Sequence, residues 1–251
     1  MADRCVAVRE MTPPQKRLDQ TLESCTRCID SKRLPKQTVV ATGFQTYLCV
    51  PTVESLMEGH CCIVPMTHVS SCLQMDEDVF DEMMLWRKGL VAMFGERDMD
   101  VCFVETAKNV NHQPHTFVEC FPLPKDAGDT LPIYFKKELL DCGEQWSSQK
   151  GKLVDLSKKG SIRGSIPKGF SYFAVDFGLQ SGYAHLIEKE DKFPAHFGKE
   201  LVGGVLDLSH NLWLRPKVDS FERQIAKAKA FKEMWQPYDW TERAKGSGTD
   251  K

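Results

Sequence analysis

The stretch EGHCCIVPMTH at residues 58–68 is followed by DEDVFDEMMLWRKGLVAMFG at residues 76–95, and these two stretches together decide the fold. Residues 61–65 are rich in strand-forming side chains and predict a buried β-strand. In the second stretch, apolar residues recur every three to four positions between Asp76, which can cap a helix, and Gly95, which can end one. A strand followed by an amphipathic helix predicts a sheet with one face covered by that helix.

Further short runs of strand-forming residues lie on both sides of this pair. They occur at residues 38–50, where Gly43 predicts a hairpin, and at residues 101–105 and 116–121. Several strands packed on one amphipathic helix are typical of an antiparallel sheet. We therefore expect an α+β domain over residues 16–124.

A second pattern follows a polar stretch that contains Pro122, Pro124, Gly128 and Pro132, which predict a domain boundary. We expect a second, smaller α+β domain over residues 125–243. Its predicted elements are a helix at residues 134–140, strands at 172–177, 183–187 and 201–206, and a last helix at 220–235. The ends of the chain, residues 1–15 and 244–251, are expected to be a flexible leader and a flexible tail.

Composition and charge exclude several classes of protein. The 251 residues have a formal net charge of −2 and are 41% hydrophobic, which suits a sizeable core and excludes a wholly basic nucleic-acid coat. No apolar run approaches the roughly 18–20 residues of a membrane span, and the first residues lack the apolar stretch of a signal peptide. We therefore expect an intracellular protein without a membrane partner, whose 10 cysteines are reduced or metal-bound.

Cys25-Thr26-Arg27-Cys28 is a C-x-x-C motif that precedes the first predicted strand. A redox dithiol normally lies between a strand and a helix, and that setting is absent here, so half of a zinc site is the better interpretation. The alternative is a pair of buried thiols without a metal. The remaining ligands would be imidazoles or thiolates that the fold brings near, and the candidates are His60, His68, His112, His115, Cys61 and Cys62.

Residues 58–68 and the later stretch QPHTFVECFP at residues 113–122 together resemble the histidine-triad superfamily. In that superfamily a G-H-x-φ-φ-P-x-x-H motif precedes a helix, and a later strand carries H-x-H-x-H or N-P-H-x-H-x-Q. The resemblance implies a histidine-triad-like antiparallel sheet with helices. It also implies a structural zinc ion, Zn2+, in a closed site whose ligands are Cys25, Cys28, His68 and His115.

The sequence departs from the triad at the position that carries the chemistry. The middle histidine, which attacks a phosphate in the superfamily, is replaced by Phe117, and Glu119 occupies the third position. A phenyl ring has no lone pair and cannot form a phospho-enzyme, so we expect a pseudoenzyme with no catalytic residue and no small-molecule substrate. The alternatives are a residual nucleotide hydrolase or transferase that uses His112 or His115, and a nucleotide-binding module without turnover.

Nearly the whole chain, from Leu22 to Trp240, resembles a narrower family. After the triad strand it carries, in this order, FPLPKDAGDTLPIYFKKEL, IPKGFSYFAVDFG, GYAHLIE, FPAHFGKELVGGVLDL and WQPYDW. These motifs resemble C-terminal domains one and two of the CwfJ family of spliceosome-associated proteins. Phe117 is typical of the branch of that family that has lost the middle histidine.

This second resemblance implies a non-catalytic, nuclear pre-mRNA splicing factor. It would dock on spliceosomal proteins, and on small nuclear RNA or intron lariat RNA, in a late spliceosome that contains the intron lariat. Members of the branch usually carry a long, charged N-terminal region. We therefore expect either a short orthologue or an assembly partner that supplies what that region does.

The glycine-rich segment from Lys150 to Lys168 is strongly basic, with a single acidic residue, Asp155. A flexible basic loop can follow an RNA backbone through phosphate contacts, and the alternative is a solvated loop without a ligand. Tyr172, in the strand that follows, is a candidate for stacking on a base, whereas His185 is expected to be a satisfied, partly buried histidine. The predicted RNA-binding residues are Lys150, Lys152, Lys158, Lys159, Arg163 and Lys168.

Overall fold

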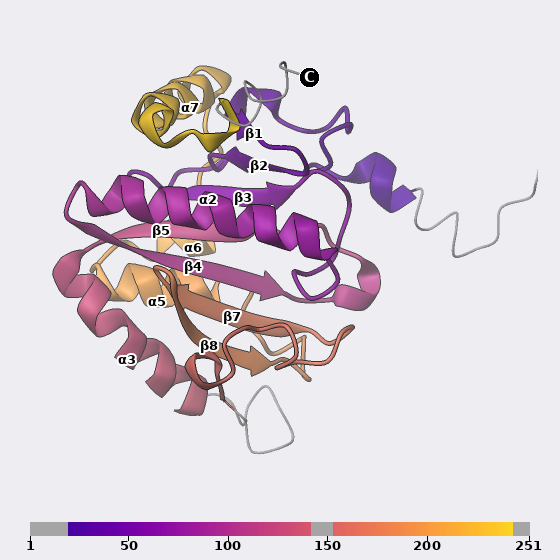
Figure 1. Cartoon of the computed structure of the whole chain (residues 1–251), viewed down its shortest axis with the longest axis vertical. Coiled ribbons are helices and arrows are strands. Elements are labelled where there is room, and N and C mark those ends of the chain that lie inside the picture. Colours follow the sequence, from indigo (N-terminus) through magenta and orange to yellow (C-terminus); the bar gives the residue numbers. More distant parts are fainter. Residues whose placement is uncertain (1–19, 142–152, 243–251) are drawn as a thin grey trace, which may run out of the picture.

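The structure, a computed structural model, describes residues 20–141 and 153–242. An eight-stranded sheet forms the centre of this part of the chain (Figure 1), and all its strand pairs are antiparallel. The strands lie in the order β1-β2-β3-β5-β4-β7-β8-β6. Their bounds are β1 Val39–Thr42, β2 Thr46–Cys49, β3 Cys61–Pro65, β4 Met99–Ala107, β5 Val118–Pro124, β6 Val154–Asp155, β7 Tyr172–Phe177 and β8 Gln180–Leu186. The predicted α+β class is confirmed, while its likeness to the histidine-triad fold stays a prediction.

Strands from both predicted domains belong to this one sheet. β4 pairs with β7 from Cys102 opposite Phe177 to Ala107 opposite Tyr172. Backbone hydrogen bonds therefore join the two parts of the chain at the centre of the sheet. The predicted domain boundary between residues 124 and 125 stays a prediction. We call the junction between β4 and β7 the seam.

The stretch that predicts a boundary forms the end of a strand and the start of a helix. Pro122 and Pro124 lie in β5, whereas Gly128 and Pro132 lie in α3, Lys125–Asp141, which begins earlier than the predicted helix. A Cβ atom at position 128 would lie 2.3 Å from Asp100 Oδ2. This glycine therefore allows α3 to pack closely on β4 and does not mark a turn.

Helices cover both faces of the sheet. On one face lies α2, Glu77–Gly95, which confirms the predicted helix and buries Met83, Trp86 and Leu90 against the strands. On the other face lie α3 and α5, Phe197–Val205, whose apolar side chains share a second core with Phe173. Figure 1 shows α2 in front of the sheet and α5 behind it.

Residues 201–206 were expected to form a strand, and this prediction is wrong because they belong largely to the helix α5. Val202 and Gly203 are buried on the helix face that contacts the sheet and the short helix α6, Asn211–Leu214. A Cβ atom at position 203 would lie 2.4 Å from the Trp213 ring, so the glycine allows close packing. A short apolar run with two glycines does not by itself distinguish a strand from a buried helix.

Tyr172 is not available for stacking on a base. Its side chain is 0% exposed, and its hydroxyl donates a hydrogen bond of 2.7 Å to Glu105 Oε2. Alternation along the strand suggests an exposed Tyr172, but both faces of β7 are covered in the fold. His185, on the neighbouring strand, was expected to be partly buried and is fully buried.

The last helix, α7, Phe221–Trp235, confirms the predicted helix and returns the chain to α2. Ser220 caps it, because its hydroxyl accepts a hydrogen bond of 3.3 Å from the Arg223 amide. The Trp235 and Trp240 rings lie 5.4 and 4.9 Å from the Trp86 ring, between centroids. The C-terminal part of the chain is therefore anchored on the first segment.

Two further observations complete the description. Within residues 20–141 and 153–242, no helix has the length and apolar character needed to cross a membrane. The predicted leader and tail, residues 1–15 and 244–251, lie outside the described residues.

Candidate functional site

Four predicted metal ligands come together from three separate loops. Cys25 and Cys28 precede β1, His68 follows β3, and His115 precedes β5. Their ligand atoms all lie within 4.8 Å of one another. The His115 Nδ1 atom is 3.3 Å from the Cys25 sulfur and 3.4 Å from the Cys28 sulfur, and His68 Nδ1 is 3.4 Å from the Cys28 sulfur.

The backbone fixes which nitrogen of each imidazole faces the two sulfurs. The Nε2 atom of His68 lies 2.8 Å from the Gln113 carbonyl oxygen, and that of His115 lies 2.9 Å from the Pro65 carbonyl oxygen. Each ring therefore donates its N–H through Nε2 and keeps the Nδ1 lone pair for a ligand bond. A backbone carbonyl that orients the ring in this way is typical of metal-binding histidines.

The spacing of the four atoms fits a tetrahedral cation. Zinc bonds of about 2.3 Å to sulfur and about 2.0 Å to nitrogen place neighbouring ligand atoms about 3.5 Å apart. The sulfur–nitrogen distances of 3.3 and 3.4 Å match that value. Two sulfurs and two imidazole nitrogens also fill all four positions of a tetrahedron, which leaves none for a substrate or a reactive water.

Burial affects the two kinds of ligand differently. It lowers the pKa of His115 to about 4, so the ring is neutral, as a metal ligand must be. Burial and the neighbouring Cys25 raise the pKa of Cys28 to about 12, so the thiol keeps its proton unless a cation is present. Binding of a cation by this group therefore releases protons.

The other candidate ligands named from the sequence lie elsewhere. His112 is exposed in a short loop, and Cys61 is a buried cross-strand neighbour of Cys120. His60 and Cys62 are also close to each other, but they lie beside Glu119 on β3 and β5. The structure therefore separates the four-membered group from the other candidate ligands named from the sequence.

Phe117 lies where the triad has its attacking histidine. The Arg27 guanidinium, from the C-x-x-C loop, stacks on this ring at 3.8 Å from the centroid. The same side of the sheet has a cavity of about 220 Å³, lined by Arg27, Phe117, Glu119 and Lys199 among others. No nucleophile stands at the triad position in this cavity.

Glu119 is already neutralised by a residue that the sequence analysis missed. The Lys199 Nζ atom, from α5, lies 2.8 Å from Glu119 Oε1, and His60 Nε2 lies 3.3 Å from the same oxygen. The Leu56 amide donates to His60 Nδ1 at 3.4 Å, so Nε2 carries the ring proton that points to Glu119. Desolvation raises the pKa of Glu119, but Lys199 and His60 outweigh it and lower the pKa to about 2.

Lys199 has little sequence signal as a partner of Glu119. The two residues are far apart in the sequence, and Lys199 precedes a run that predicts a strand. Lys199 lies in the helix α5, and from the sheet face that α5 covers its side chain reaches Glu119 near the beginning of β5. Only the G-K-E pattern of the second resemblance marks this lysine in the sequence.

The predicted basic loop divides into exposed and inward-facing residues. Lys158, Lys159 and Lys168 are exposed, whereas Lys150 and Lys152 lie outside the described residues. Arg163 faces inward, and its Nη2 atom donates to the carbonyl oxygens of Cys72, Met75 and Asp76 at 3.3, 2.7 and 3.1 Å. Its guanidinium also lies 4.4 Å from the Phe80 ring centroid.

These contacts change the interpretation of Arg163. A guanidinium that donates to three carbonyls and stacks on a ring holds the loop against the start of α2. It is therefore a structural residue that holds the loop in place in this fold, and the predicted RNA contact remains with the exposed lysines. The sequence could not distinguish the two roles, because both require a cation in a glycine-rich loop.

Comparison with known proteins identifies both parts of the chain. A family described as "Protein similar to CwfJ C-terminal" matches residues 12–136, and one described as "Protein similar to CwfJ C-terminus 2" matches residues 145–241. The chain belongs to the CwfJ family. The two CwfJ matches lie on the two sides of the seam, so the single sheet contains strands from both.

Several CwfJ relatives are similar over most of this chain. Human CWF19-like protein 2 is 49% identical over 220 residues, which cover 88% of this chain and 24% of the human protein. The Caenorhabditis elegans CWF19-like protein 2 homolog is 44% identical over 241 residues, which cover 96% of this chain and 52% of that protein. Pre-mRNA-splicing factor cwf19 of Schizosaccharomyces pombe is 28% identical over 234 residues, or 90% of this chain and 36% of the yeast protein. The chain thus spans between about a quarter and about half of the length of these CwfJ relatives.

Proposed function

We propose that the chain is a non-catalytic part of the pre-mRNA splicing machinery. It docks on protein and RNA in a late, intron-lariat-containing spliceosome in the nucleus. Membership of the CwfJ family carries this proposal, because one of the relatives is named a pre-mRNA-splicing factor. The chain contributes binding surfaces and does not turn over a nucleotide.

The geometry at the triad position supports a role without catalysis. Phe117 offers no lone pair to a phosphorus atom, and its ring is covered by the Arg27 guanidinium. Glu119 is held in an ion pair with Lys199 at 2.8 Å, so it is not free to act as a general base. The cavity beside them therefore has charged walls, and the triad position in it carries no nucleophile.

We further propose that Cys25, Cys28, His68 and His115 hold a structural zinc ion. The ion supplies a closed tetrahedral link between the loops before β1, after β3 and before β5. The two carbonyls of Gln113 and Pro65 orient the imidazoles toward it. Because the C-x-x-C loop carries Arg27, the link also holds this arginine over Phe117.

RNA docking is assigned to the exposed lysines of the basic loop. Lys158, Lys159 and Lys168 are exposed on the part of the loop that the structure describes. Phosphate contacts from such lysines add affinity without reading the sequence, and they weaken as salt is raised. The loop is therefore expected to follow an RNA backbone that other spliceosomal components hold in place.

A gentle pull-down of the tagged chain from nuclear extract tests this proposal, with sequencing of bound RNA and identification of bound proteins. We expect recovery of late small nuclear RNAs together with excised intron lariats. The double change Lys158→Glu/Lys159→Glu should reduce RNA recovery. The matched double change Lys229→Glu/Lys232→Glu, on the exposed face of α7, should leave it unchanged. Recovery of neither spliceosomal RNA nor spliceosomal protein would refute the proposal.

A further inference from the structure

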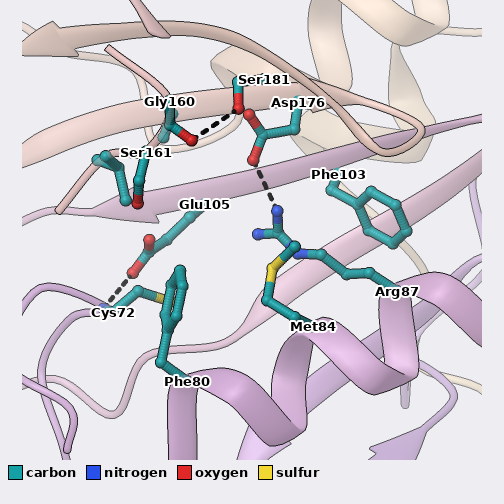
Figure 2. A pocket seen from close by; sticks show the side chains of 12 residues that line it. Cys72, Phe80, Met84, Arg87, Phe103, Glu105, Gly160, Ser161, Asp176 and Ser181 are labelled. Atoms are coloured by element: carbon teal, nitrogen blue, oxygen red, sulfur yellow. Dashed lines mark hydrogen bonds and ion pairs between the residues drawn. The ribbon is translucent and has the colours of Figure 1, made fainter. Parts of the chain in front are cut away.

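A second cavity lies at the seam, on the sheet face that α2 covers. It has a volume of about 210 Å³ and lies between α2, the seam strands β4 and β7, and the loop that contains Gly160 and Ser161. Figure 2 shows Phe80, Met84 and Arg87 reaching into it from α2, with Glu105 and Asp176 from the two seam strands. Neither the metal group nor the Phe117 cavity includes these residues.

Three charged side chains line this cavity, and each has partners within the protein. Arg87 Nη1 lies 2.6 Å from Asp176 Oδ2, and the other Asp176 oxygen accepts a hydrogen bond of 3.0 Å from the Gly182 amide. Glu105 accepts from the Cys72 amide at 2.8 Å and from the Tyr172 hydroxyl at 2.7 Å. Two carboxylates and one guanidinium leave the lining formally negative, so the part of a ligand that enters the cavity should be uncharged and not anionic.

The cavity nevertheless keeps unused hydrogen-bonding capacity. The Arg87 Nε atom is buried and has no partner among the described residues. Each carboxylate oxygen can accept two hydrogen bonds, and Glu105 Oε2 receives one, from Tyr172. A ligand that carries both donors and acceptors on one edge would satisfy these groups, whereas an apolar ligand would leave them unpaired.

The walls suit a flat ring. Phe80 and Phe103 present aromatic side chains from opposite elements, and Met84 lies between α2 and the seam strands. The Arg87 guanidinium lies 5.1 Å from the Phe103 ring centroid. Bases that leave a single strand of RNA are held between such side chains and hydrogen-bonded along their polar edges.

Two exposed lysines precede the loop that forms one side of the cavity. Gly160 and Ser161 form one side, Ser181 lies across from them, and the exposed Lys158 and Lys159 immediately precede the glycine. The Lys158 ammonium lies 3.7 Å from Asp155 Oδ2, and both lysines are close in the sequence to the residues that form this side of the cavity. The arrangement places a polar-edged slot beside a loop that carries exposed lysines.

We propose that this cavity binds one unstacked nucleobase of single-stranded RNA, with its phosphates at Lys158 and Lys159. The inference rests on the proposed RNA docking and adds the place and the chemical class of the contact. The base is recognised by its ring and its polar edge, so the affinity has a part that does not depend on phosphate charge.

Free nucleosides test the cavity without any backbone charge. The probes are adenosine, guanosine, cytidine and uridine, titrated to millimolar concentration while methyl resonances of Met84, Ile162 and Ala174 are followed by NMR. We expect saturable shifts of these methyl groups with at least one nucleoside. Ser181→Trp, which fills the mouth, should abolish them, and Ser209→Trp, on an exposed loop, should not. Ser161→Phe closes the same mouth from the other side and serves if Ser181→Trp lowers the thermal midpoint.

A second comparison separates this inference from the general RNA proposal. An eight-nucleotide single-stranded RNA should bind about tenfold more tightly than an abasic strand of the same charge, since stacking of a base contributes at this level. Ser181→Trp should remove that difference, whereas Lys158→Glu/Lys159→Glu should weaken both strands. Equal binding of the two strands, or nucleosides that shift no cavity methyl, would overturn the base pocket and leave RNA docking intact. A chain that binds no strand, and recovers no spliceosomal component in the pull-down, would overturn both.

Discussion

The metal group and the seam both join distant parts of the chain, but they do so in different ways. At the metal group, two thiols and two imidazoles face one another with no opposite charge between them. At the seam, Arg87 pairs with Asp176, and Glu105 accepts a hydrogen bond from Tyr172, so the charged side chains there find partners within the protein. The first junction has the donor atoms for a cation, whereas the second is held by contacts between protein groups.

The two junctions therefore differ in what they require for stability. A group of thiols and imidazoles stabilises the fold only when a metal replaces the protons of its thiols. Buried charges that pair with one another need no cofactor, but loss of one partner leaves the other buried and uncompensated. Metal removal should therefore loosen the N-terminal loops, and changes at the seam should act equally with or without metal.

Removal of one metal ligand should have the largest effect. Structural zinc can contribute on the order of 10 kcal/mol to folding, so Cys28→Ser should unfold the segment around the metal group and abolish stoichiometric zinc. Elemental analysis and thermal unfolding check this result. Cys49→Ser, which changes a cysteine outside the group, should keep the zinc. Well-folded wild-type chain that contains no metal would show that the zinc proposal is wrong.

Loss of the buried carboxylate at the seam should come next. Glu105→Leu leaves the Cys72 amide and the hydroxyls of Thr116 and Tyr172 without their acceptor. We expect the free energy of unfolding to fall by about 4 kcal/mol in urea titrations. Tyr172→Phe removes a single donor and should cost about 1 kcal/mol. Zinc content should not change in either variant, and a parallel loss of zinc would contradict the independence of the two junctions.

The Glu119–Lys199 ion pair should make the free energy of unfolding depend on pH in the acid range. The pKa of Glu119 falls from an ordinary 4.5 to about 2 in the folded chain, so its ionised form is stabilised by about 3 kcal/mol. This contribution is fully present above pH 4.5 and is lost as the pH falls toward 2, because the unfolded chain takes up the proton first. Glu119→Gln should therefore be less stable than the wild type at pH 7, with the difference shrinking toward pH 2.5. Urea unfolding across this range measures it, and a constant difference would refute the ion pair as its source.

Release of the basic loop should have the smallest effect. Arg163→Met removes the hydrogen bonds to three carbonyls but keeps an apolar stem against Phe80, so we expect a loss of about 2 kcal/mol. Lys159→Met, at an exposed position of the same loop, should not measurably change thermal unfolding. Equal effects of the two substitutions would show that Arg163 belongs with the exposed lysines and does not hold the loop against the start of α2.

The sequence by itself determined the features that depend on local pattern and residue chemistry. The apolar spacing between Asp76 and Gly95 predicts α2, and that of the last helix predicts α7, because a single helix face is buried in each. Phe117 excludes a phosphohistidine at that position whatever the fold. The C-x-x-C motif indicated half of a metal site, the resemblance to the histidine-triad superfamily implied the two histidines, and the structure brings these four residues together.

The tertiary structure alone decided which distant residues meet. The sequence predicted a strand for residues of α5 and an exposed side chain for Tyr172, and both predictions are wrong. The spacing of apolar residues does not identify the exposed face of an element when both of its faces are buried. Lys199 reaches Glu119, and Arg87 reaches Asp176, across long separations in the sequence. Such charge pairs leave no local pattern, since their geometry is set by how the strands and helices pack and not by their neighbours in the chain.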